Sequence, residues 1–323
     1  MNILVTGGAG FIGSFMTKAL LDRGYYVVVF DSLERGQRDA VDPRAKFIQG
    51  DIKDTVALDT LFGQNQIDAV MHFAGYISVE ESTKNPEVYF QNNIVGSQNL
   101  FNTAIAHGVK KFIFSSSAAV YGNPTIIPIP EDHPKNPTSP YGQNKLDAEK
   151  ILADLCSKHT DLSFASLRYF NAAGASLDGV LGENHKPETH IIPLAINAII
   201  ENKEFNLFGT DYNTEDGTCI RDYIHVLDLV DAHILALEKL SEDVGEHYYN
   251  VGTGNGYSNR EVLTTIEEVS GKKINIVERE KRAGDADKLI ADPTKIKTEL
   301  GFVPQYSDLK TIVKTAWDYY SKK

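Results

Sequence analysis

The sequence predicts an α/β fold in which a doubly wound parallel sheet is followed by a smaller α/β domain. Short apolar runs alternate with amphipathic stretches of helical length through the first half of the chain. The first run leads directly into a glycine-rich turn, and the second closes with an aspartate. Strands that alternate with helices are joined by right-handed crossovers, and the strands then lie parallel in one sheet.

The elements of the first half follow one another along the chain. Each expected strand is short and apolar, as in sheets that are covered on both faces. A helix is expected from the glycine-rich turn to a stop at Gly24. Further strands are expected at residues 3–5, 25–30, 47–48, 69–73, 112–114 and 164–167, and further helices at residues 54–62, 86–107 and 141–158.

The character of the chain changes after residue 168. Residues 171–190 are polar and show no periodicity, so we expect a long functional loop there. We place a first domain at residues 1–170 and a second, smaller domain at residues 171–323, and later segments remain free to return to the first. The expected elements are helices at 191–201 and 227–240, strands at 205–208 and 248–251, and a turn-rich stretch at 210–218.

The composition limits the partners of the protein. The chain has 323 residues and a net charge of −12, which disfavours nucleic acid or an anionic membrane surface as the main partner. No stretch approaches the run of about 18 apolar residues that a membrane span needs. The first strand begins without a basic region or a cleavage-type site, so we expect a cytoplasmic protein. The two cysteines, Cys156 and Cys219, are far apart, and the nine histidines pair with no Cys or acid at ligand spacing, so no metal is expected.

The turn after the first strand has the spacing of a dinucleotide-binding loop. Gly7, Gly10 and Gly13 lie between a strand and a helix, where glycines let backbone N–H groups and the helix N-terminus approach a pyrophosphate. Asp31 ends the second strand 18 residues after Gly13, close to where a Rossmann-type fold places the acid that binds ribose hydroxyls. A carboxylate there repels a 2′-phosphate and favours NAD, whereas two nearby arginines leave NADP open.

Three polar side chains form a second pattern. Ser117 follows a central strand, and a hydroxyl there points into the crevice at the carboxyl edge of the sheet. Tyr141 and Lys145 are four residues apart and share one helix face. A buried cation beside a phenol favours phenolate, and lowering a tyrosine pKa from about 10 toward 7 takes roughly 4 kcal/mol of differential stabilisation. The pattern predicts a general acid or base that works near neutral pH.

Together, the glycine triplet, Asp31 and the Ser-Tyr-Lys set resemble the extended short-chain dehydrogenase/reductase family and, within it, the UDP-glucose 4-epimerases. The likeness extends over nearly the whole chain and includes the strings at residues 167–171, 211–218 and 220–226. The resemblance implies an isomerase with tightly bound NAD that interconverts UDP-galactose and UDP-glucose through a 4-keto sugar. It further implies that the sugar turns its other face before the hydride returns.

The resemblance also implies a role for each site residue. Tyr141 is expected to take the proton from the 4-hydroxyl, Lys145 to lower the pKa of Tyr141 and hold the nicotinamide ribose, and Ser117 to hydrogen-bond the reacting oxygen. The expected cofactor-binding residues are Gly7, Gly10, Phe11, Ile12, Gly13, Asp31, Ser32, Asp51, Ile52, Phe73, Ala74, Gly75, Asn92, Ser115, Tyr141, Lys145 and Tyr169. The expected substrate-binding residues are Ser117, Tyr141, Phe170, Asn171, His190, Phe208, Arg221, Arg282 and Leu289. Among them, Phe208 is expected to lie against the uracil. Arg221 and Arg282 are expected to bind the diphosphate, because a guanidinium group matches the geometry of phosphate oxygens.

The sequence argues against one related reaction and leaves others open. A 4,6-dehydratase needs an added acid and base, and an Asp-Glu pair supplies them in the dehydratases that the chain resembles. Ala118 and Ala119 stand at those positions and transfer no protons. Another nucleotide-sugar epimerase, such as a UDP-glucuronate 4-epimerase, stays open. So do a ketone reductase, which would consume NADH steadily, and a non-catalytic NAD-sensing protein, which would be expected to lose Tyr141 or Lys145.

Three further features bear on the substrate, the cofactor and the assembly. Leu289 stands where some relatives have a tyrosine on the C2 side of the sugar, so N-acetylated UDP-sugars stay open as substrates. Ile77 stands where some epimerases have a lysine, which puts one cofactor contact in doubt. The helices expected at 86–107 and 141–158 form a four-helix bundle between subunits in the family, so a homodimer is expected.

Overall fold

The computed structural model describes residues 1–185, 187–281 and 285–322, and the chain divides into two units. Each unit combines segments that are far apart in the sequence. The division of residues 1–170 and 171–323 into a cofactor domain and a substrate domain stays a prediction. Unit 1 contains Met1–Gly122, Lys135–Arg168 and Val230–Tyr249, and unit 2 contains Asn123–Pro134, Tyr169–Leu229 and Asn250–Lys323.

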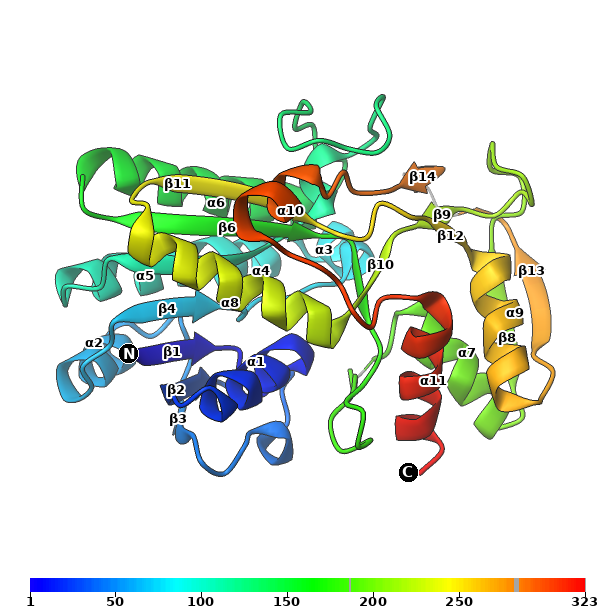
Figure 1. The fold of residues 1–323 in the computed structure, drawn as a ribbon, viewed down its shortest axis with the longest axis horizontal. Coiled ribbons are helices and arrows are strands. Elements are labelled where there is room, and N and C mark those ends of the chain that lie inside the picture. Colours follow the sequence, from blue (N-terminus) through cyan, green and yellow to red (C-terminus); the bar gives the residue numbers. More distant parts are fainter. Residues whose placement is uncertain (186, 282–284, 323) are drawn as a thin grey trace. The chain divides into compact units, whose positions relative to one another are not determined.

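Unit 1 is built on a seven-stranded parallel sheet with helices on both faces (Figure 1). The strand order is β11-β6-β5-β4-β1-β2-β3. The chain runs outward from β1 to one edge, returns to the middle at β4 and runs outward to the other edge. The sheet is therefore doubly wound, and the predicted fold class is confirmed. The strands are β1 (Asn2–Thr6), β2 (Tyr26–Asp31), β3 (Lys46–Gln49), β4 (Ala69–His72), β5 (Lys111–Ser117), β6 (Ser163–Tyr169) and β11 (Glu246–Val251).

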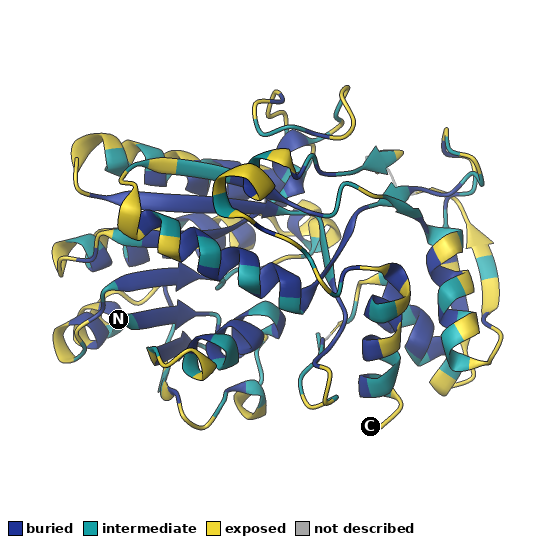
Figure 2. Ribbon diagram, in the orientation of Figure 1, coloured by how far each residue is buried: buried dark blue, intermediate teal, exposed yellow. Residues whose placement is uncertain are grey.

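Helices α2, α5 and α6 share one apolar core with the strands of the sheet. Leu58, Leu100 and Leu152 of these helices are fully buried in it, together with Leu4 and Phe112 of the sheet. Burying one such side chain contributes about 1.5–3 kcal/mol. Figure 2 shows the central strands of the sheet as buried and the outer faces of the helices as exposed. The helical elements are α1 (Phe11–Asp22), η1 (Arg38–Ala40), α2 (Thr55–Gln64), α3 (Val79–Lys84), α4 (Pro86–Phe90), η2 (Gln91–Gly96), α5 (Ser97–Ala106), η3 (Ala118–Tyr121), α6 (Pro140–Lys158) and α8 (Val226–Glu242).

The single helix expected at residues 86–107 is divided in the structure. Segment η2 between α4 and α5 is a π-helix, and the additional helix α3 precedes it. Asn93 is buried in η2, where its side chain accepts a hydrogen bond from Tyr76 N at 2.8 Å and donates one to Tyr76 O at 2.9 Å. The wider turn thus directs an amide to the loop after β4, and apolar periodicity carries no signal for such a turn.

A buried histidine closes β4 at the centre of the sheet. The two ring nitrogens of His72 lie 2.7 Å from Thr6 Oγ1 and 2.8 Å from Ser97 Oγ. Burial lowers the pKa of His72 to about 3, and the charge of Lys145 acts in the same direction. The neutral imidazole therefore belongs to the folded state over the whole range above that pH.

The protein is expected to lose stability in acid partly through His72. The unfolded state takes up a proton near pH 6.5 and the folded state does not, so stability falls with pH below 6.5 by about 1.4 kcal/mol per pH unit. The variant H72N keeps a donor and an acceptor but does not titrate. Urea unfolding of both proteins at pH 7.5 and pH 5.0 measures the effect, and the parent is expected to lose about 2 kcal/mol more than the variant. Equal losses would contradict the assignment.

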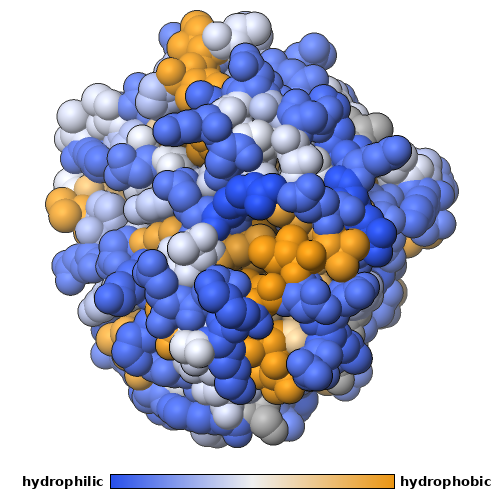
Figure 3. Space-filling model, turned by 90° about the vertical axis from the view of Figure 1, so that its right-hand side faces the viewer, coloured by the Kyte–Doolittle hydropathy of each residue, from blue (hydrophilic) through white to orange (hydrophobic). Residues whose placement is uncertain are grey.

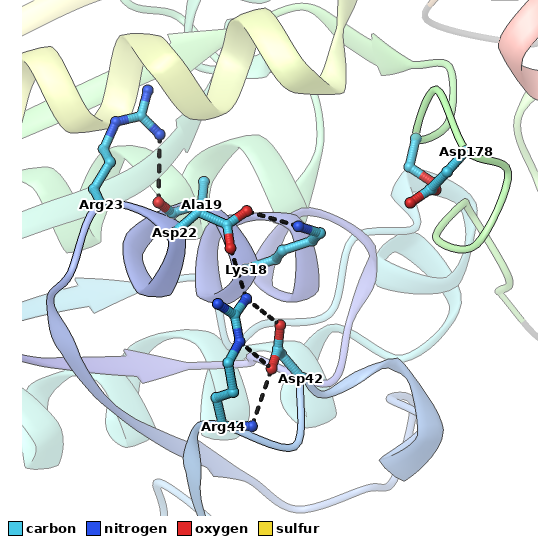
Figure 4. Close-up of polar contacts among 8 residues, drawn as sticks. Lys18, Ala19, Asp22, Arg23, Asp42, Arg44 and Asp178 are labelled. Carbon is cyan, nitrogen blue, oxygen red and sulfur yellow. Dashed lines mark hydrogen bonds and ion pairs between the residues drawn. The ribbon is translucent and has the colours of Figure 1, made fainter.

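Exposed ion pairs join α1 to the segment before β3 (Figure 4). Arg44 Nη2 lies 2.7 Å from both Asp22 Oδ1 and Asp42 Oδ2, and Lys18 Nζ donates to Asp22 Oδ2 at 2.6 Å. The hydrogen bonds from Lys18 and Arg44 lower the pKa of Asp22. Because Lys18, Asp22 and Arg44 are about half exposed, water and salt screen these pairs, and they contribute little to stability.

Unit 2 combines short strands with a group of three packed helices. Helices α7, α9 and α11 contact one another and bury Ile196, Ile266 and Ile312 in one core. Ser258 and Glu261 form a capping box at the start of α9, which satisfies two N–H groups of its first turn. The elements are β7 (Asn171–Ala173), α7 (Ile191–Ile200), β8 (Glu204–Phe208), β9 (Ile220–Arg221), β10 (Tyr223–His225), β12 (Tyr257–Ser258), α9 (Asn259–Ser270), β13 (Asn275–Arg279), β14 (Lys288–Leu289), α10 (Thr294–Leu300) and α11 (Leu309–Tyr320).

The surface in Figure 3 is mostly hydrophilic and carries a hydrophobic band near its middle. A helix both long enough and apolar enough to cross a membrane is absent from the residues that the structure describes. Neither Cys156 nor Cys219 forms a disulfide.

Candidate active site

The glycine-rich loop between β1 and α1 is shaped by close backbone contacts. A Cβ on Gly7, whose φ is +74°, would lie 2.5 Å from Ala74 N, and one on Gly13 would lie 2.1 Å from Gly7 O. Gly10 is the N-cap of α1 and offers no side chain to the N–H groups of the first turn. The N–H groups of the first turn and the helix dipole suit an anion such as a pyrophosphate at a terminus of this kind.

Asp31 braces this loop from the end of β2. Its Oδ2 accepts a hydrogen bond from Ala9 N at 2.9 Å, and its Oδ1 accepts one from Leu33 N at 2.8 Å. The carboxylate is buried and therefore has a fixed orientation. It can accept hydrogen bonds from ribose hydroxyls, because each carboxylate oxygen has more than one acceptor site.

The other predicted cofactor residues of unit 1 also cluster near the carboxyl ends of its strands. Asp51 follows β3, and Phe73 follows β4. The buried Asn92 lies in η2, where its side chain donates to Asn93 Oδ1 at 3.0 Å. In an open α/β sheet, ligands bind outside this edge, where the strand order reverses. Phe11 and Ile12 open α1, Ser32 follows β2, Ile52 follows Asp51, Ala74 and Gly75 follow Phe73, and Ser115 lies in β5. Tyr169, the last residue of β6, belongs to unit 2.

Helix α6 carries Tyr141 and Lys145 on one buried face. Ser139 caps the helix by accepting a hydrogen bond from Gly142 N, and Pro140 occupies its first turn. Lys145 Nζ donates to Ser115 O at 2.6 Å and lies 5.9 Å from the centre of the Tyr141 ring. The structure thus brings the phenol and the ammonium together at the end of β5.

The pKa of Tyr141 differs from the sequence-based expectation. Burial raises the pKa of the Tyr141 phenol, and a hydrogen bond with the Ser117 side chain opposes that shift. Burial also lowers the pKa of Lys145 to about 8, which the charge of Glu149 opposes. The expected lowering of the Tyr141 pKa is therefore wrong for this structure, because desolvation of the phenolate outweighs the favourable contacts.

Among the predicted substrate residues of unit 2, the structure brings Arg221 and Leu289 together. They are register partners in β9 and β14. Arg221 Nη1 donates to Ile220 O at 2.9 Å and to Ala286 O at 2.8 Å, and the guanidinium forms an ion pair of 3.8 Å with Asp285. These contacts orient the guanidinium, which is mostly buried.

The other predicted substrate residues that the structure describes in unit 2 lie on or next to several of its elements. Asn171 Nδ2 donates to Asp222 O at 2.9 Å, which links Asn171 to the neighbour of Arg221. Phe170 precedes β7, and Phe208 ends β8. Arg282 lies outside the described residues.

His190, the N-cap of α7, belongs to a cluster of two histidines and two carboxylates. His190 Nδ1 contacts Glu183 Oε1, and His185 Nδ1 lies 3.0 Å from the same oxygen. The ligand atoms of the four side chains lie within 4.8 Å of one another, so the expectation that no histidine pairs with an acid at ligand spacing is wrong. The nitrogens point at Glu183 itself. Burial opposes charge on both partners, but their attraction dominates, raising the pKa of His190 to about 9 and lowering that of Glu183 to about 2. The cluster members are Glu183, His185, Glu188 and His190.

Known proteins that are similar to this chain over its whole length include UDP-glucose 4-epimerases, as the sequence predicts. A UDP-glucose 4-epimerase of Lactobacillus helveticus is 46% identical over 321 residues, which cover 99% of this chain and 97% of the relative. The structure of a UDP-glucose 4-epimerase from Brucella ovis in complex with NAD superposes with a TM-score of 0.95 at 45% identity, covering 99% and 98% of the two chains. That of a UDP-glucose 4-epimerase from Bifidobacterium longum in complex with NAD+ and UDP gives 0.95 at 37% identity, covering 100% and 98%.

A family model supports the same assignment. Residues 3–252 match the NAD dependent epimerase/dehydratase family, and this range includes the glycine-rich loop, Asp31 and the Ser-Tyr-Lys set. With a match over most of its length and near full-length relatives at more than 40% identity, the chain belongs to the NAD dependent epimerase/dehydratase family.

Proposed function

We propose that the protein interconverts UDP-galactose and UDP-glucose by inverting C4 of the hexose with a bound NAD. The observation that carries the proposal is the Ser117, Tyr141 and Lys145 group at the end of β5, in a chain that is similar over its whole length to UDP-glucose 4-epimerases. Unit 1 would bind the cofactor, and unit 2 would bind the nucleotide sugar.

The residues of unit 1 fit NAD. Gly7 and Gly13 permit the close backbone contacts of the loop before α1, and Gly10 places no capping side chain at the helix N-terminus, where a pyrophosphate would bind. Asp31 offers acceptors to the ribose hydroxyls. When bound, NAD would supply a hydride acceptor and a positively charged ring, both of which the protein itself lacks. Lys145 would hold the nicotinamide ribose from its place beside Ser115.

The reaction needs one group that moves a proton at the sugar 4-oxygen. Tyr141 would accept the proton of the 4-hydroxyl and return it after the sugar has turned. The Ser117 hydroxyl, which hydrogen-bonds Tyr141, would stabilise charge on the same oxygen. The charge of Lys145 would favour the phenolate, provided that Lys145 stays protonated.

The nucleotide part of the substrate would supply most of the affinity. Arg221 and Arg282 would bind the diphosphate, Phe208 would pack against the uracil, and Phe170, Asn171, His190 and Leu289 would surround the rest of the ligand. A loosely held hexose could then turn over within the site while the diphosphate stays in place. Ala118 and Ala119 open η3 where a dehydratase needs an acid and a base, which supports epimerisation over dehydration.

Incubation with UDP-galactose in the absence of added cofactor tests the proposal. Chromatographic separation is expected to show UDP-glucose, with no steady consumption of NADH. Conversion of UDP-glucuronate instead, or continuous oxidation of NADH, would overturn it. UDP-N-acetylglucosamine tests whether the site accepts an N-acetyl group at C2 of the sugar. A rate below about a thousandth of the rate with UDP-glucose, equivalent to about 4 kcal/mol in the activation free energy, would exclude N-acetylated substrates.

The affinity of the protein for NAD is expected to fall when Asp31 is changed. The variant D31A removes acceptors for the ribose and for Ala9 N and Leu33 N, so NAD is expected to bind about 10- to 100-fold more weakly. The Kd of the apoprotein, measured by quenching of tyrosine and tryptophan fluorescence, checks this. The variant D39N, which changes an exposed carboxylate of η1, is the control and is expected to bind NAD as the parent does.

The homodimer and the cytoplasmic location are part of the same proposal. Val88 and Phe90 of α4 are 51% and 43% exposed, and Phe90 lines a hollow of about 580 Å³ between α4 and the start of α6. An exposed apolar surface of this kind suits a second copy of the chain. Light scattering is expected to give twice the mass of one chain for the parent and the mass of one chain for the variant F90D. A monomeric parent would exclude the dimer.

A further inference from the structure

A buried ion pair continues the reactive face of α6. Tyr141, Lys145 and Glu149 are spaced four residues apart, and all three are buried. Arg168 of β6 is 1% exposed and binds Glu149 in a bidentate manner, with Nε 2.8 Å from Oε1 and Nη2 2.7 Å from Oε2. Neither the Tyr-Lys pattern nor the proposed mechanism uses this pair.

Glu149 also binds strand β5. Ser116 Oγ donates to Glu149 Oε1 at 2.5 Å, and Lys145 Nζ donates to Ser115 O at 2.6 Å. Two consecutive residues of β5 are therefore held by two residues from one face of α6. The next residue along β5 is Ser117, so these contacts fix the point from which its hydroxyl leaves the strand.

Arg168 extends the connection to the turn after Ser117. Its Nη1 donates to Tyr121 Oη at 3.0 Å, and its guanidinium carbon lies 5.4 Å from the centre of the Tyr121 ring. Ala119 N donates to Ser117 Oγ at 3.2 Å within the same turn. The segment that carries Ser117 is thus held on one side by Glu149 and on the other by Arg168.

We propose that Glu149 is a positioning residue for the epimerisation: through Ser116 and Arg168 it holds Ser117 against Tyr141 at the end of β5. The inference rests on the proposed function. A role in stability alone would be served at least as well by apolar side chains, because burying two charges costs several kcal/mol per ion. The bonds from Glu149 to the residue before Ser117 make position, rather than stability, the function of the pair.

The charges around Lys145 give a second way to recognise this role. Burial lowers the pKa of Lys145 to about 8, and the Glu149 carboxylate opposes the shift. Without that carboxylate, Lys145 would lose its proton at a lower pH, and its support for a phenolate would end there. The titratable and charged groups facing Lys145 are Tyr141 and Glu149 from α6, the neutral His72 from β4 and, through Glu149, Arg168 from β6 and Tyr121 from η3.

The test separates position from stability with three variants. Apolar replacement of a buried ion pair is often neutral for stability, so E149M/R168M is expected to keep the parental Tm. Its kcat is expected to fall about 10- to 100-fold, since a small misplacement of catalytic groups has effects of this size, while the Kd for UDP stays unchanged. E149Q is expected to move the alkaline limb of the kcat profile about one pH unit lower. S116A, which leaves the ion pair in place, is expected to lower kcat about 10-fold.

The control is D154N, which removes an exposed carboxylate from the same helix and is expected to leave kcat and its pH profile unchanged. A double variant with parental Tm, kcat and pH profile would overturn the inference, as would parental kcat in S116A. Titration of Lys145 by NMR with 13C-labelled lysine, assigned with K145R, measures its pKa in the parent and in E149Q without turnover. Absence of epimerisation by the parent would overturn the proposed function, and the titration would still test the effect of Glu149 on Lys145.

Discussion

Replacing Tyr141 with Phe is expected to lower kcat for C4 epimerisation by about 10²- to 10⁴-fold, the usual contribution of a positioned acid or base. The substitution keeps the ring, which packs with Tyr76, Tyr89 and Ala119. It removes only the hydroxyl, which hydrogen-bonds Ser117 and would take the proton of the sugar. The rate at which UDP-galactose becomes UDP-glucose, followed by chromatography, measures the effect.

The matched control is Y223F, which removes the hydroxyl of another buried tyrosine, in β10. It is expected to epimerise at the parental rate. Circular dichroism of Y141F is expected to match the parent, since the lost group is a single oxygen in an intact core. A Y141F protein that converts substrate as fast as the parent would show that another group moves the proton, and the proposed mechanism would then fail.

The pKa of Tyr141 makes the reaction depend on more than the pair that the sequence identifies. Burial raises the pKa of the phenol and lowers that of Lys145, so both groups resist the charged forms that catalysis needs. Each charge must therefore be stabilised by fixed contacts: the Ser117 hydroxyl for the phenolate, and the Ser115 carbonyl and Glu149 for the ammonium. The arrangement is workable only if these contacts are held in place, which is the role that we assign to Glu149.

Local patterns in the sequence were enough to predict the fold, and they also supplied the candidates for its reactive groups. Short apolar strands alternate with helices in the sheet as expected, because a parallel strand buried on both faces must be apolar throughout. Gly7 and Gly13 could be recognised because only a glycine fits such close backbone contacts. Tyr141 and Lys145 follow from helical spacing, and the structure joins that helix to β5 at Ser115.

The features that escaped prediction depend on contacts between distant segments. Glu149 and Arg168 are 19 positions apart, and only the packing of α6 on β6 makes them a buried pair. The pairing of His190 with Glu183 depends on the path of an irregular loop, and no periodicity encodes that path. The sign of the Tyr141 pKa shift depends on burial, which a spacing of four residues does not specify.

Unit 2 is expected to be strongly destabilised by D222A. Asp222 is fully buried, and its carboxylate accepts hydrogen bonds from Thr253 N and Oγ1, both at 2.9 Å, from Gly254 N at 3.0 Å and from Ala291 N at 3.2 Å. Burial raises the pKa of Asp222, and the bonds from Thr253 oppose that shift. Alanine would leave these buried donors without their acceptor, at a cost of about 3–5 kcal/mol in the free energy of unfolding. Urea unfolding at pH 7.5 measures the loss.

The same variant connects the stability of unit 2 to its proposed role. Asp222 is the neighbour of Arg221, and its backbone carbonyl accepts hydrogen bonds from Asn171 N at 3.1 Å and Nδ2 at 2.9 Å. D222A is therefore expected to weaken UDP binding as well, because two proposed nucleotide-sugar contacts are attached to the segment that the carboxylate holds. The control E278Q breaks an exposed ion pair with Arg260 and is expected to change stability by less than about 1 kcal/mol and UDP binding not at all. D222A keeps both Arg221 and Asn171, so weaker UDP binding at temperatures where the variant is still folded would show that the position of these two residues matters. A D222A protein with parental stability would show that the buried carboxylate does not hold Thr253, Gly254 and Ala291 in place.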